Sequence, residues 1–402
     1  MPLIIVADDL TGAADSAARC YHAGLTADIY LAPTEEALPG GAAAFSTDSR
    51  YLSPEAAGQQ VSAVISALSI SQPATWYKKI DSTLRGNIGA ELDAMLKLLT
   101  PQGAQPCAVI CPAFPAQGRG LVDGYLAHAT TPARTLHLPT LLAEQTARPL
   151  VALALATVRS GVPHLAAQLA QAQQAGVELF VVDAVHDTDL DILLDATRLA
   201  LPHALLCGSA GLVEPLARAY AGQHGPPRPV AEPPTLLRRP VLAVIGSGSA
   251  MAHRQIDALR SAADARLVAA RLVTVQPGMT NPVLGEALAE QNDDWIVHLP
   301  QPDATDILEG AAARQLVAEL ATVAEQMAHR LQPATLIIIG GDTAVHLLSR
   351  FGIVRLTVLA ELMPGIPLLA GVDTAGRDWH IITKAGNFGD PATLVKLLHF
   401  VR

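Results

Sequence analysis

Short apolar runs alternate with longer amphipathic stretches along most of the chain. The runs are rich in Val, Ile, Leu and Ala and end at glycine or polar residues, which is typical of strands buried in a parallel sheet. The stretches between them repeat apolar positions every three or four residues, which is typical of helices with one buried face. This alternation predicts an α/β fold in which helices cover both faces of mostly parallel sheets.

The pattern runs through the first half of the chain and then begins again. The strands that it predicts are residues 3–7, 27–31, 42–46, 75–80, 108–111, 179–182, 204–207, 241–245, 266–270, 295–299, 335–339, 357–360 and 380–383. The helices that it predicts are one that ends at Gly24 and residues 54–68, 87–99, 162–175, 190–201, 211–221, 251–261, 305–331 and 391–401.

A proline-rich stretch separates the two halves. Residues 225–240 read GPPRPVAEPPTLLRRP and have no periodicity. Because proline fixes φ and lacks an N–H donor, such a stretch is expected to be an extended linker. The length of 402 residues agrees with two or three domains. We therefore expect two three-layer α/β/α domains, residues 1–225 and 241–402, joined by a linker over 226–240.

Composition narrows the classes of function. Half of the residues are hydrophobic and 16% are charged, which is enough apolar material for two cores. The net charge of −10 argues against nucleic acid or an anionic membrane as the main partner. A protein this acidic that binds a small anion must concentrate its cations locally. The chain has only five lysines, and two of them, Lys78 and Lys79, are adjacent.

The cysteines and the first residues bear on the cellular location. The four cysteines form no CxxC pair and lie in or beside apolar runs, so buried free thiols are expected, as in a reducing cytoplasm. The start MPLIIVADD does not have the pattern of a signal peptide, and no long uncharged apolar stretch follows. We expect a cytoplasmic protein. The thirteen histidines form neither HxH nor HExxH, so we expect no zinc site.

Two adjacent carboxylates, Asp8 and Asp9, follow the first predicted strand. Such a pair repels itself unless a cation, an arginine or ligand hydroxyl groups lie nearby. Helix capping by Asp9 or Thr11 is the structural alternative, and it explains one acid but not the second. We therefore expect Asp8 and Asp9 to belong to a binding or catalytic site.

The most charged stretch is YKKIDSTLRGNIG, at a strand-to-helix turn where α/β folds bind ligands. Lys79 and Arg85 are candidates to bind an anion, and Asp81 and Ser82 are candidates to bond its hydroxyl groups. Alternation along a strand sends Lys78 and Lys79 to opposite sides, so we expect only Lys79 in the site. A solvated loop is the alternative.

Two arginines follow other predicted strands in the first half. Arg50 ends the sequence FSTDSR, and its planar fork is suited to a carboxylate. Arg119 ends the CPAFPAQGR loop and is a second candidate for binding an anion. For Arg50 the equal alternative is a helix N-cap followed by a surface arginine, and for Arg119 it is a structural ion pair.

Three glycine-containing turns follow predicted strands in the second half: GSGSA, GGDTA and KAGNFGD. Backbone N–H groups and hydroxyls at helix N-termini bind phosphates, and Asp342 is a candidate ligand of hydrated Mg²⁺. GSGSA lacks the third glycine of GxGxxG, and there is no GxxxxGK[ST], so a Rossmann or P-loop site is disfavoured. Structural turns are the alternative. Three such turns in one half favour a nucleotide as the ligand. The candidates for binding it are Ser247, Ser249, Gly340, Gly341, Asp342, Thr343 and Gly386.

Taken in order, ADDLTGA, KKIDSTLRGNIG, PAFPAQGR, GSGS, GGDTA and KAGNFG resemble the four-carbon acid sugar kinase family across essentially the whole chain. The resemblance implies an ATP-dependent kinase of D-threonate, D-erythronate or 3-oxo-tetronate, with the reaction in the cleft between the domains. The resemblance implies that Asp9, Arg50, Lys79, Ile80, Asp81 and Ser82 hold the acid sugar, and that ATP meets Ser247 or Ser249, Gly340 to Thr343, and Gly386.

The expected reaction is in-line transfer of the γ-phosphoryl group to the terminal hydroxyl, with Asp9 or Asp81 accepting the proton and Asp9 favoured. A sugar-acid sensor without catalysis is the alternative of another class, and a dehydrogenase is more remote. The sequence does not select the tetronate, although we favour D-threonate. It leaves the oligomeric state open, and a homodimer is compatible with it.

Overall fold

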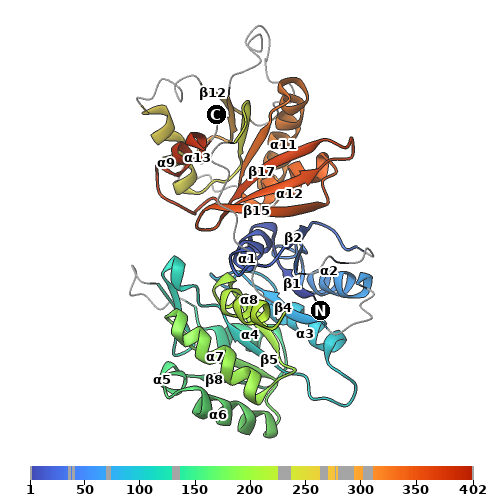
Figure 1. Cartoon of the computed structure of the whole chain (residues 1–402), viewed down its shortest axis with the longest axis vertical. Helices are drawn as coiled ribbons and strands as arrows, with labels where there is room; N and C mark the ends of the chain where they lie inside the picture. Colours follow the sequence, from blue (N-terminus) through green and yellow to red (C-terminus); the bar gives the residue numbers. More distant parts are fainter. Residues whose placement is uncertain are drawn as a thin grey trace. The chain divides into compact units, whose positions relative to one another are not determined.

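The computed structural model describes residues 2–34, 38, 41–68, 74–128, 136–224, 237–262, 270–276, 278, 294–301 and 311–400. It divides into two compact units, Met1–Pro229 and Val230–Arg402, which are called the first and second unit below (Figure 1). Most of the predicted linker over 226–240 lies outside the described residues. Among those residues, no helix combines the length and apolar character needed to cross a membrane.

The first unit is built on one sheet with strand order β2-β3-β1-β4-β10-β5-β9-β8, and every pair in it is parallel. The strands are β1 (Leu3–Ala7), β2 (Ala27–Tyr30), β3 (Ala42–Ser46), β4 (Thr75–Lys79), β5 (Ala108–Cys111), β8 (Leu150–Leu153), β9 (Leu179–Val182) and β10 (Leu205–Gly208). Strands β6 (Arg119–Val122) and β7 (Tyr125–His128) form a separate antiparallel hairpin.

Helices lie in two groups in the first unit. One group packs as α1 with α8, α8 with α7, and α7 with α5 and α6, and the other as α2 with α3 and α3 with α4. Ile4 and Val6 of β1 pack in one core cluster with Val61 of α2 and Leu92 of α3. The helices are α1 (Leu10–His22), α2 (Pro54–Ala67), α3 (Ile88–Leu99), α4 (Leu138–Gln145), α5 (Leu155–Arg159), α6 (Val162–Gln174), α7 (Asp187–Ala200) and α8 (Ala210–His224), with a 3₁₀ turn η1 (Pro115–Gln117).

The second unit has a mixed sheet of strand order β12-β13-β11-β14-β17-β16-β15. The pairs are parallel as far as β17, and β17-β16-β15 are antiparallel. Its strands are β11 (Val241–Ile245), β12 (Arg271–Thr274), β13 (Trp295–His298), β14 (Thr335–Ile339), β15 (Arg355–Met363), β16 (Ile366–Val372) and β17 (Asp378–Lys384). Helices α9 (Ala250–Arg260) and α13 (Thr393–His399) pack together, as do α11 (Ala311–Leu331) and α12 (Gly341–Arg350), on either side of the sheet (Figure 1).

The structure confirms the predicted α/β class with mostly parallel sheets. Several strands were not predicted: β6, β7, β8 and β16. In β16 the apolar run contains Pro367 and Gly371, residues that weaken the sequence signal of a strand. The predicted strand at 266–270 lies mostly outside the described residues, and the strand β12 begins at Arg271. All four cysteines are free and buried, as expected.

The sheet of the first unit brings three loops to one edge. In the parallel register Ala7 of β1 lies beside Ser46 of β3 and Lys79 of β4, so the chain leaves all three strands at the same level. From β1 the chain continues to β2 and β3 on one side and then to β4 on the other. A reversal of this kind opens a crevice at the carboxyl ends of the strands, where α/β proteins bind ligands. The predicted residues of the first unit lie in these loops, except Lys79, which ends β4, and Arg119, which begins β6 after β5.

Candidate functional site

Arg50 resolves the repulsion between Asp8 and Asp9. Its Nε and Nη2 donate to the two oxygens of Asp8 at 2.7 and 3.0 Å, and Nη1 donates to Asp9 Oδ2 at 2.7 Å. Asp8 is buried and the other two are nearly so. These bonds occupy three of the five N–H donors of a guanidinium. The arginine required by the acid pair is therefore Arg50, which reaches it from the loop after β3.

Asp9 caps a helix with one carboxylate oxygen and accepts from Arg50 with the other. Its Oδ1 accepts a hydrogen bond from Gly12 N at 2.8 Å, so Asp9 is the N-cap of α1. Burial raises the pKa of Asp9, and Asp8 adds to that effect, whereas Arg50, Lys79 and the bond from Gly12 oppose it. A carboxylate with a raised pKa holds a proton better, so Asp9 is suited to accept one.

Asp81 lies in the opposite electrostatic situation. Burial favours its neutral form, but Arg50 nearby and the hydrogen bonds from Arg85 and Thr83 outweigh it and hold the pKa of Asp81 well below its usual range. Thr83 donates its hydroxyl at 2.5 Å to the oxygen that also accepts from Arg85 Nε. Asp81 therefore stays ionised and holds a proton poorly, which makes it a better partner for hydroxyl groups than a base.

The two lysines of β4 point in opposite directions, as alternation requires. Lys79 is buried and its Nζ donates to the carbonyl oxygen of Ile80 at 2.9 Å. A Cβ on Gly12 would lie 2.7 Å from Lys79 Nζ and 2.7 Å from Asp9 Oδ1, so the glycine allows this ammonium to approach the start of α1. Lys78 points away and pairs with Glu91 of α3.

Arg119 and Arg85 border this group. Arg119 Nη1 donates to Ser82 Oγ at 2.5 Å, which brings the loop after β5 to the loop after β4. The Arg85 side chain is 54% exposed and pairs with Asp81. The structure thus gathers five residues that we call the polar cluster: Asp8, Asp9, Arg50, Lys79 and Asp81. Arg85 pairs with Asp81 of this cluster, and Arg119 bonds Ser82 beside it.

The three glycine turns of the second unit also converge, because β11, β14 and β17 are neighbours. A Cβ on Gly386 would lie 1.7 Å from Ser247 Oγ, and one on Gly246 would lie 2.1 Å from Thr343 Oγ1. Gly340 has φ +119° and lies close to the backbone nitrogen of Ser247. Turns that are up to 140 residues apart therefore touch, and glycine is required where they do.

Hydroxyl and backbone N–H groups lie where the three glycine turns meet. Ser249 is the N-cap of α9, with Oγ accepting from Ala252 N at 3.2 Å, and Ser247 Oγ accepts from Ser249 N at 3.2 Å. Helix α12 begins at Gly341, directly after Gly340. Two helix N-termini with hydroxyl groups form an arrangement that binds phosphate groups.

Asp342 lies in the first turn of α12 and is exposed. Mg²⁺ in nucleotide sites keeps several waters and takes one or two carboxylates together with phosphate oxygens. One exposed carboxylate beside a phosphate-binding turn fits that donor set. Asp342 would thus hold the ion, whose charge would neutralise the phosphates of the nucleotide.

The third glycine turn is shaped by a buried lysine and a glutamine. Lys384 Nζ donates to the carbonyl oxygens of Ala385 at 2.8 Å and Phe388 at 3.0 Å, and Gln255 Nε2 donates to Phe388 O at 3.0 Å. Burial lowers the pKa of Lys384 to about 8. These bonds fix the loop that brings Gly386 against Ser247.

Substituting Gly386 by alanine is expected to disrupt this convergence. The added Cβ would lie 1.7 Å from Ser247 Oγ and 2.5 Å from Ser247 Cβ, so the two turns must separate. Overpacking of this kind costs about 1–3 kcal/mol. We expect the Kd for an ATP analogue, measured by calorimetry, to rise about tenfold or more. Gly222→Ala is the control, because its Cβ meets nothing within 4 Å; an unchanged Kd in the Gly386 variant would contradict the arrangement.

Lys384 also predicts how stability depends on pH. Its pKa of about 8 in the folded protein lies below the ordinary lysine pKa of 10.5, so between these values the unfolded chain binds more protons. Stability from this group therefore rises as pH increases from about 8 to 10.5. Urea unfolding of the wild type and of Lys384→Met across this range isolates the contribution. We expect the wild type to gain relative to the variant, and parallel curves would refute the shifted pKa.

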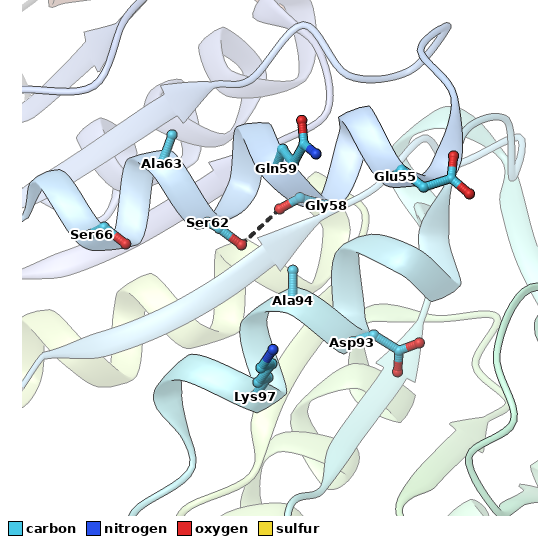
Figure 2. A pocket seen from close by; sticks show the side chains of 9 residues that line it. All are labelled: Glu55, Gly58, Gln59, Ser62, Ala63, Ser66, Asp93, Ala94 and Lys97. Atoms are coloured by element: carbon cyan, nitrogen blue, oxygen red, sulfur yellow. Dashed lines mark hydrogen bonds between the residues drawn. The ribbon is translucent and has the colours of Figure 1, made fainter.

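A shallow groove between α2 and α3 lies apart from these residues (Figure 2). The helices pack closely at Gly58, where a Cβ would be in van der Waals contact with Ala90 O at 3.5 Å. The groove is lined by Glu55, Gly58, Gln59, Ser62, Ala63, Ser66, Asp93, Ala94 and Lys97, none of which belongs to the polar cluster. In Figure 2 the Ser62 hydroxyl bonds within its own helix.

Sequence reasoning missed the residues that support the site. The sequence patterns indicate no role for four of these residues: Glu91, Thr47, Ser49 and Gln255. The available signal was Glu91 itself, a carboxylate beside Leu92 on the apolar face of a predicted helix. A buried acid on such a face requires a cation. Lys78, the lysine predicted to point away from the ligand, is that cation.

Two family models match the chain. Residues 3–216 match a model described as a sugar-binding N-terminal domain, and residues 242–394 match one described as a nucleotide-binding C-terminal domain. The first match covers the polar cluster and the second covers the three glycine turns. The fold and its two sites thus define a protein that combines a sugar-binding with a nucleotide-binding domain.

Full-length relatives specify the family. A D-threonate kinase of Bordetella bronchiseptica is 30% identical over 99% of this chain and 97% of its own, and one of Cupriavidus necator is 33% identical over 98% and 96%. Other relatives are named D-erythronate kinase, in Heliobacterium modesticaldum, and 3-oxo-tetronate kinase, in Brucella melitensis, the latter 26% identical. A solved structure from Salmonella typhimurium LT2 aligns with TM-score 0.74 at 25% identity, covering 99% of this chain and 98% of that one. The chain belongs to the four-carbon acid sugar kinase family.

Proposed function

We propose that this protein transfers the γ-phosphoryl group of ATP to the terminal hydroxyl of a tetronate, with D-threonate as the favoured substrate. The observation that carries the proposal is the polar cluster, which joins a base of raised pKa, an ionised carboxylate and buried cations at the carboxyl ends of β1, β3 and β4. A hydroxylated acid needs cations to bind its carboxylate, a carboxylate to bond its hydroxyl groups and a base to accept the proton of the hydroxyl that is phosphorylated. The preference for D-threonate rests on the full-length identity to kinases of that name.

The two units divide the work in this proposal. Lys79 provides the cation for the sugar acid, and Asp81 and Ser82 bond its hydroxyl groups. Arg50, held by Asp8 and Asp9, offers its remaining N–H donors to the same anion. The three glycine turns of the second unit bind the phosphates of ATP through backbone N–H groups, Ser247, Ser249 and Thr343. Transfer requires that the phosphate held by one unit reach the hydroxyl held by the other.

The chemistry follows from these positions. Phosphoryl transfer depends mainly on positioning and on neutralising charge, so the cations of the site stabilise the phosphoryl oxygens. Asp342 would hold Mg²⁺, which would add positive charge beside the phosphates. Asp9 accepts the proton of the attacking hydroxyl late in the reaction. Arg50 limits the charge that the pair Asp8 and Asp9 presents to an anionic substrate. Unpaired thiols and the use of ATP agree with a reducing cytoplasm.

The test is a coupled assay of ADP formation with D-threonate, D-erythronate and 3-oxo-tetronate. We expect turnover with at least one of them, and the highest kcat/KM with D-threonate. Erythronate differs at one carbon, so discrimination depends on hydroxyl partners in the pocket. Calorimetric binding of a tetronate without ADP formation would favour the sensor instead.

A further inference from the structure

A buried ion pair lies directly behind the polar cluster. Lys78 Nζ is 2.7 Å from Glu91 Oε2, and their side chains are 0% and 1% exposed. Lys78 also donates to the carbonyl oxygens of Val6 and Lys79, at 3.3 and 3.2 Å. Removing two charges from water costs several kcal/mol per ion in proteins, and apolar residues would often serve stability as well. The pair therefore suggests a role besides stability.

The second oxygen of Glu91 reaches the loop that carries Arg50. Ser49 Oγ donates to Glu91 Oε1 at 2.5 Å, and it lies 2.6 Å from the hydroxyl of Thr47. Ser49 is completely buried. Glu91 of α3 thus accepts a hydrogen bond from the loop after β3 with one oxygen, and its other oxygen pairs with Lys78.

The loop after β3 contains one residue in the left-handed region. Asp48 has φ +48°, a conformation that aspartate adopts more readily than most residues with a side chain. The backbone nitrogens of Ser49 and Arg50 both donate to the carbonyl oxygen of Asp8, at 3.0 and 3.3 Å. Arg50 directly follows Ser49, so a shift of Ser49 moves the guanidinium relative to Asp8 and Asp9.

We infer that Glu91 is a positioning residue, which acts through the Ser49 hydroxyl to hold Arg50 against Asp8 and Asp9 and so sets the geometry of the sugar-acid site. The inference rests on the proposed function for its kinetic consequences. Lys78 holds Glu91 in place through the ion pair at 2.7 Å, and the sugar acid touches neither of them. The contacts run from Glu91 of α3 to the Ser49 hydroxyl, and from there through the backbone to Arg50 of the polar cluster.

Ser49→Ala removes that hydroxyl and leaves the ion pair intact. We expect kcat/KM for the tetronate to fall at least about tenfold, the loss expected for a charge-assisted hydrogen bond, with the Kd for ATP unchanged. Thr197→Ala is the matched control, because its buried hydroxyl donates to the carbonyl oxygen of Leu193 in its own helix at 2.8 Å. Wild-type kcat/KM in the Ser49 variant would overturn the inference.

A matched pair of double variants separates positioning from stability, because single changes at Lys78 or Glu91 leave a buried charge unpaired. Lys78→Met with Glu91→Gln is neutral and keeps an acceptor for Ser49, whereas Lys78→Met with Glu91→Leu is neutral and removes it. We expect the variant with glutamine to exceed the variant with leucine about tenfold in kcat/KM. Equal values in two folded variants would contradict the role of Glu91.

One arm does not depend on turnover. If the wild type phosphorylated no tetronate, the proposed function would fail, but the contact chain would still be testable in thermal unfolding. Ser49→Ala and Arg50→Met are expected to be non-additive, so that the Tm loss of the double variant is smaller than the sum of the single losses. Additive losses would show that Ser49 does not hold Arg50.

Discussion

Asp9→Asn is expected to lower kcat by about 100-fold or more, within the range of 10²–10⁴ typical of a removed general base. Burial raises the pKa of Asp9, whereas Asp81 is held ionised by its cations and hydroxyl donor, so Asp9 is the better proton acceptor of the two. Asparagine caps helices as well as aspartate does, so the bond from Gly12 N can persist. The measurement is steady-state kinetics with ADP detection.

Asp189→Asn is the matched control for this change. Asp189 is also a buried carboxylate near a helix start, and it is paired with Arg159 at 3.0 Å. It lies outside the polar cluster, at the start of α7. We expect the control to lose stability and to keep kcat. If Asp9→Asn kept nearly full kcat, the assignment of the base would be wrong.

Lys79→Ala is expected to raise KM for the tetronate about 10- to 100-fold. Hydrogen bonds to charged groups contribute about 1.5–3 kcal/mol, and each 1.4 kcal/mol is a factor of ten in affinity. Lys79 Nζ lies beside Asp9 and is buried, so no surface residue replaces it. Nucleotide binding belongs to the second unit in our proposal, and the Kd for ATP is expected to stay within about twofold.

Lys97→Ala provides the comparison for that variant. Lys97 is an exposed lysine of α3 in the same unit, and its loss should change neither constant. A fall in ATP affinity on substituting Lys79, with tetronate KM unchanged, would show that the division of labour between the units is wrong.

Local rules predicted much of the site. Alternation along β4 correctly separated Lys79 from Lys78. The adjacent acids were expected to have a cation, an arginine or ligand hydroxyl groups nearby, and the structure shows that Arg50 lies there. Capping and ligand binding at Asp9 were posed as alternatives, although one carboxylate has an oxygen for each partner. The structure confirms the cap, and the role of Asp9 in ligand binding or catalysis stays a prediction.

The contacts that complete the site depend on strand order, which local patterns do not determine. Arg50 meets Asp8 because β3 lies beside β1, and Gly386 meets Ser247 because only β14 separates β17 from β11. The buried pair of Lys78 and Glu91 depends in the same way on where α3 packs. Residue types thus indicated the chemistry, and the sheet order decided which of them meet.

The most direct test of the account is ³¹P NMR of the wild-type protein with ATP, Mg²⁺ and D-threonate. The account predicts that a phosphomonoester signal appears in equal amount to ADP, coupled to the protons of the terminal carbon. The same spectrum with Asp9→Asn should develop about 100-fold more slowly. Release of inorganic phosphate in place of the ester with every tetronate, or binding of both ligands without any transfer, would contradict it.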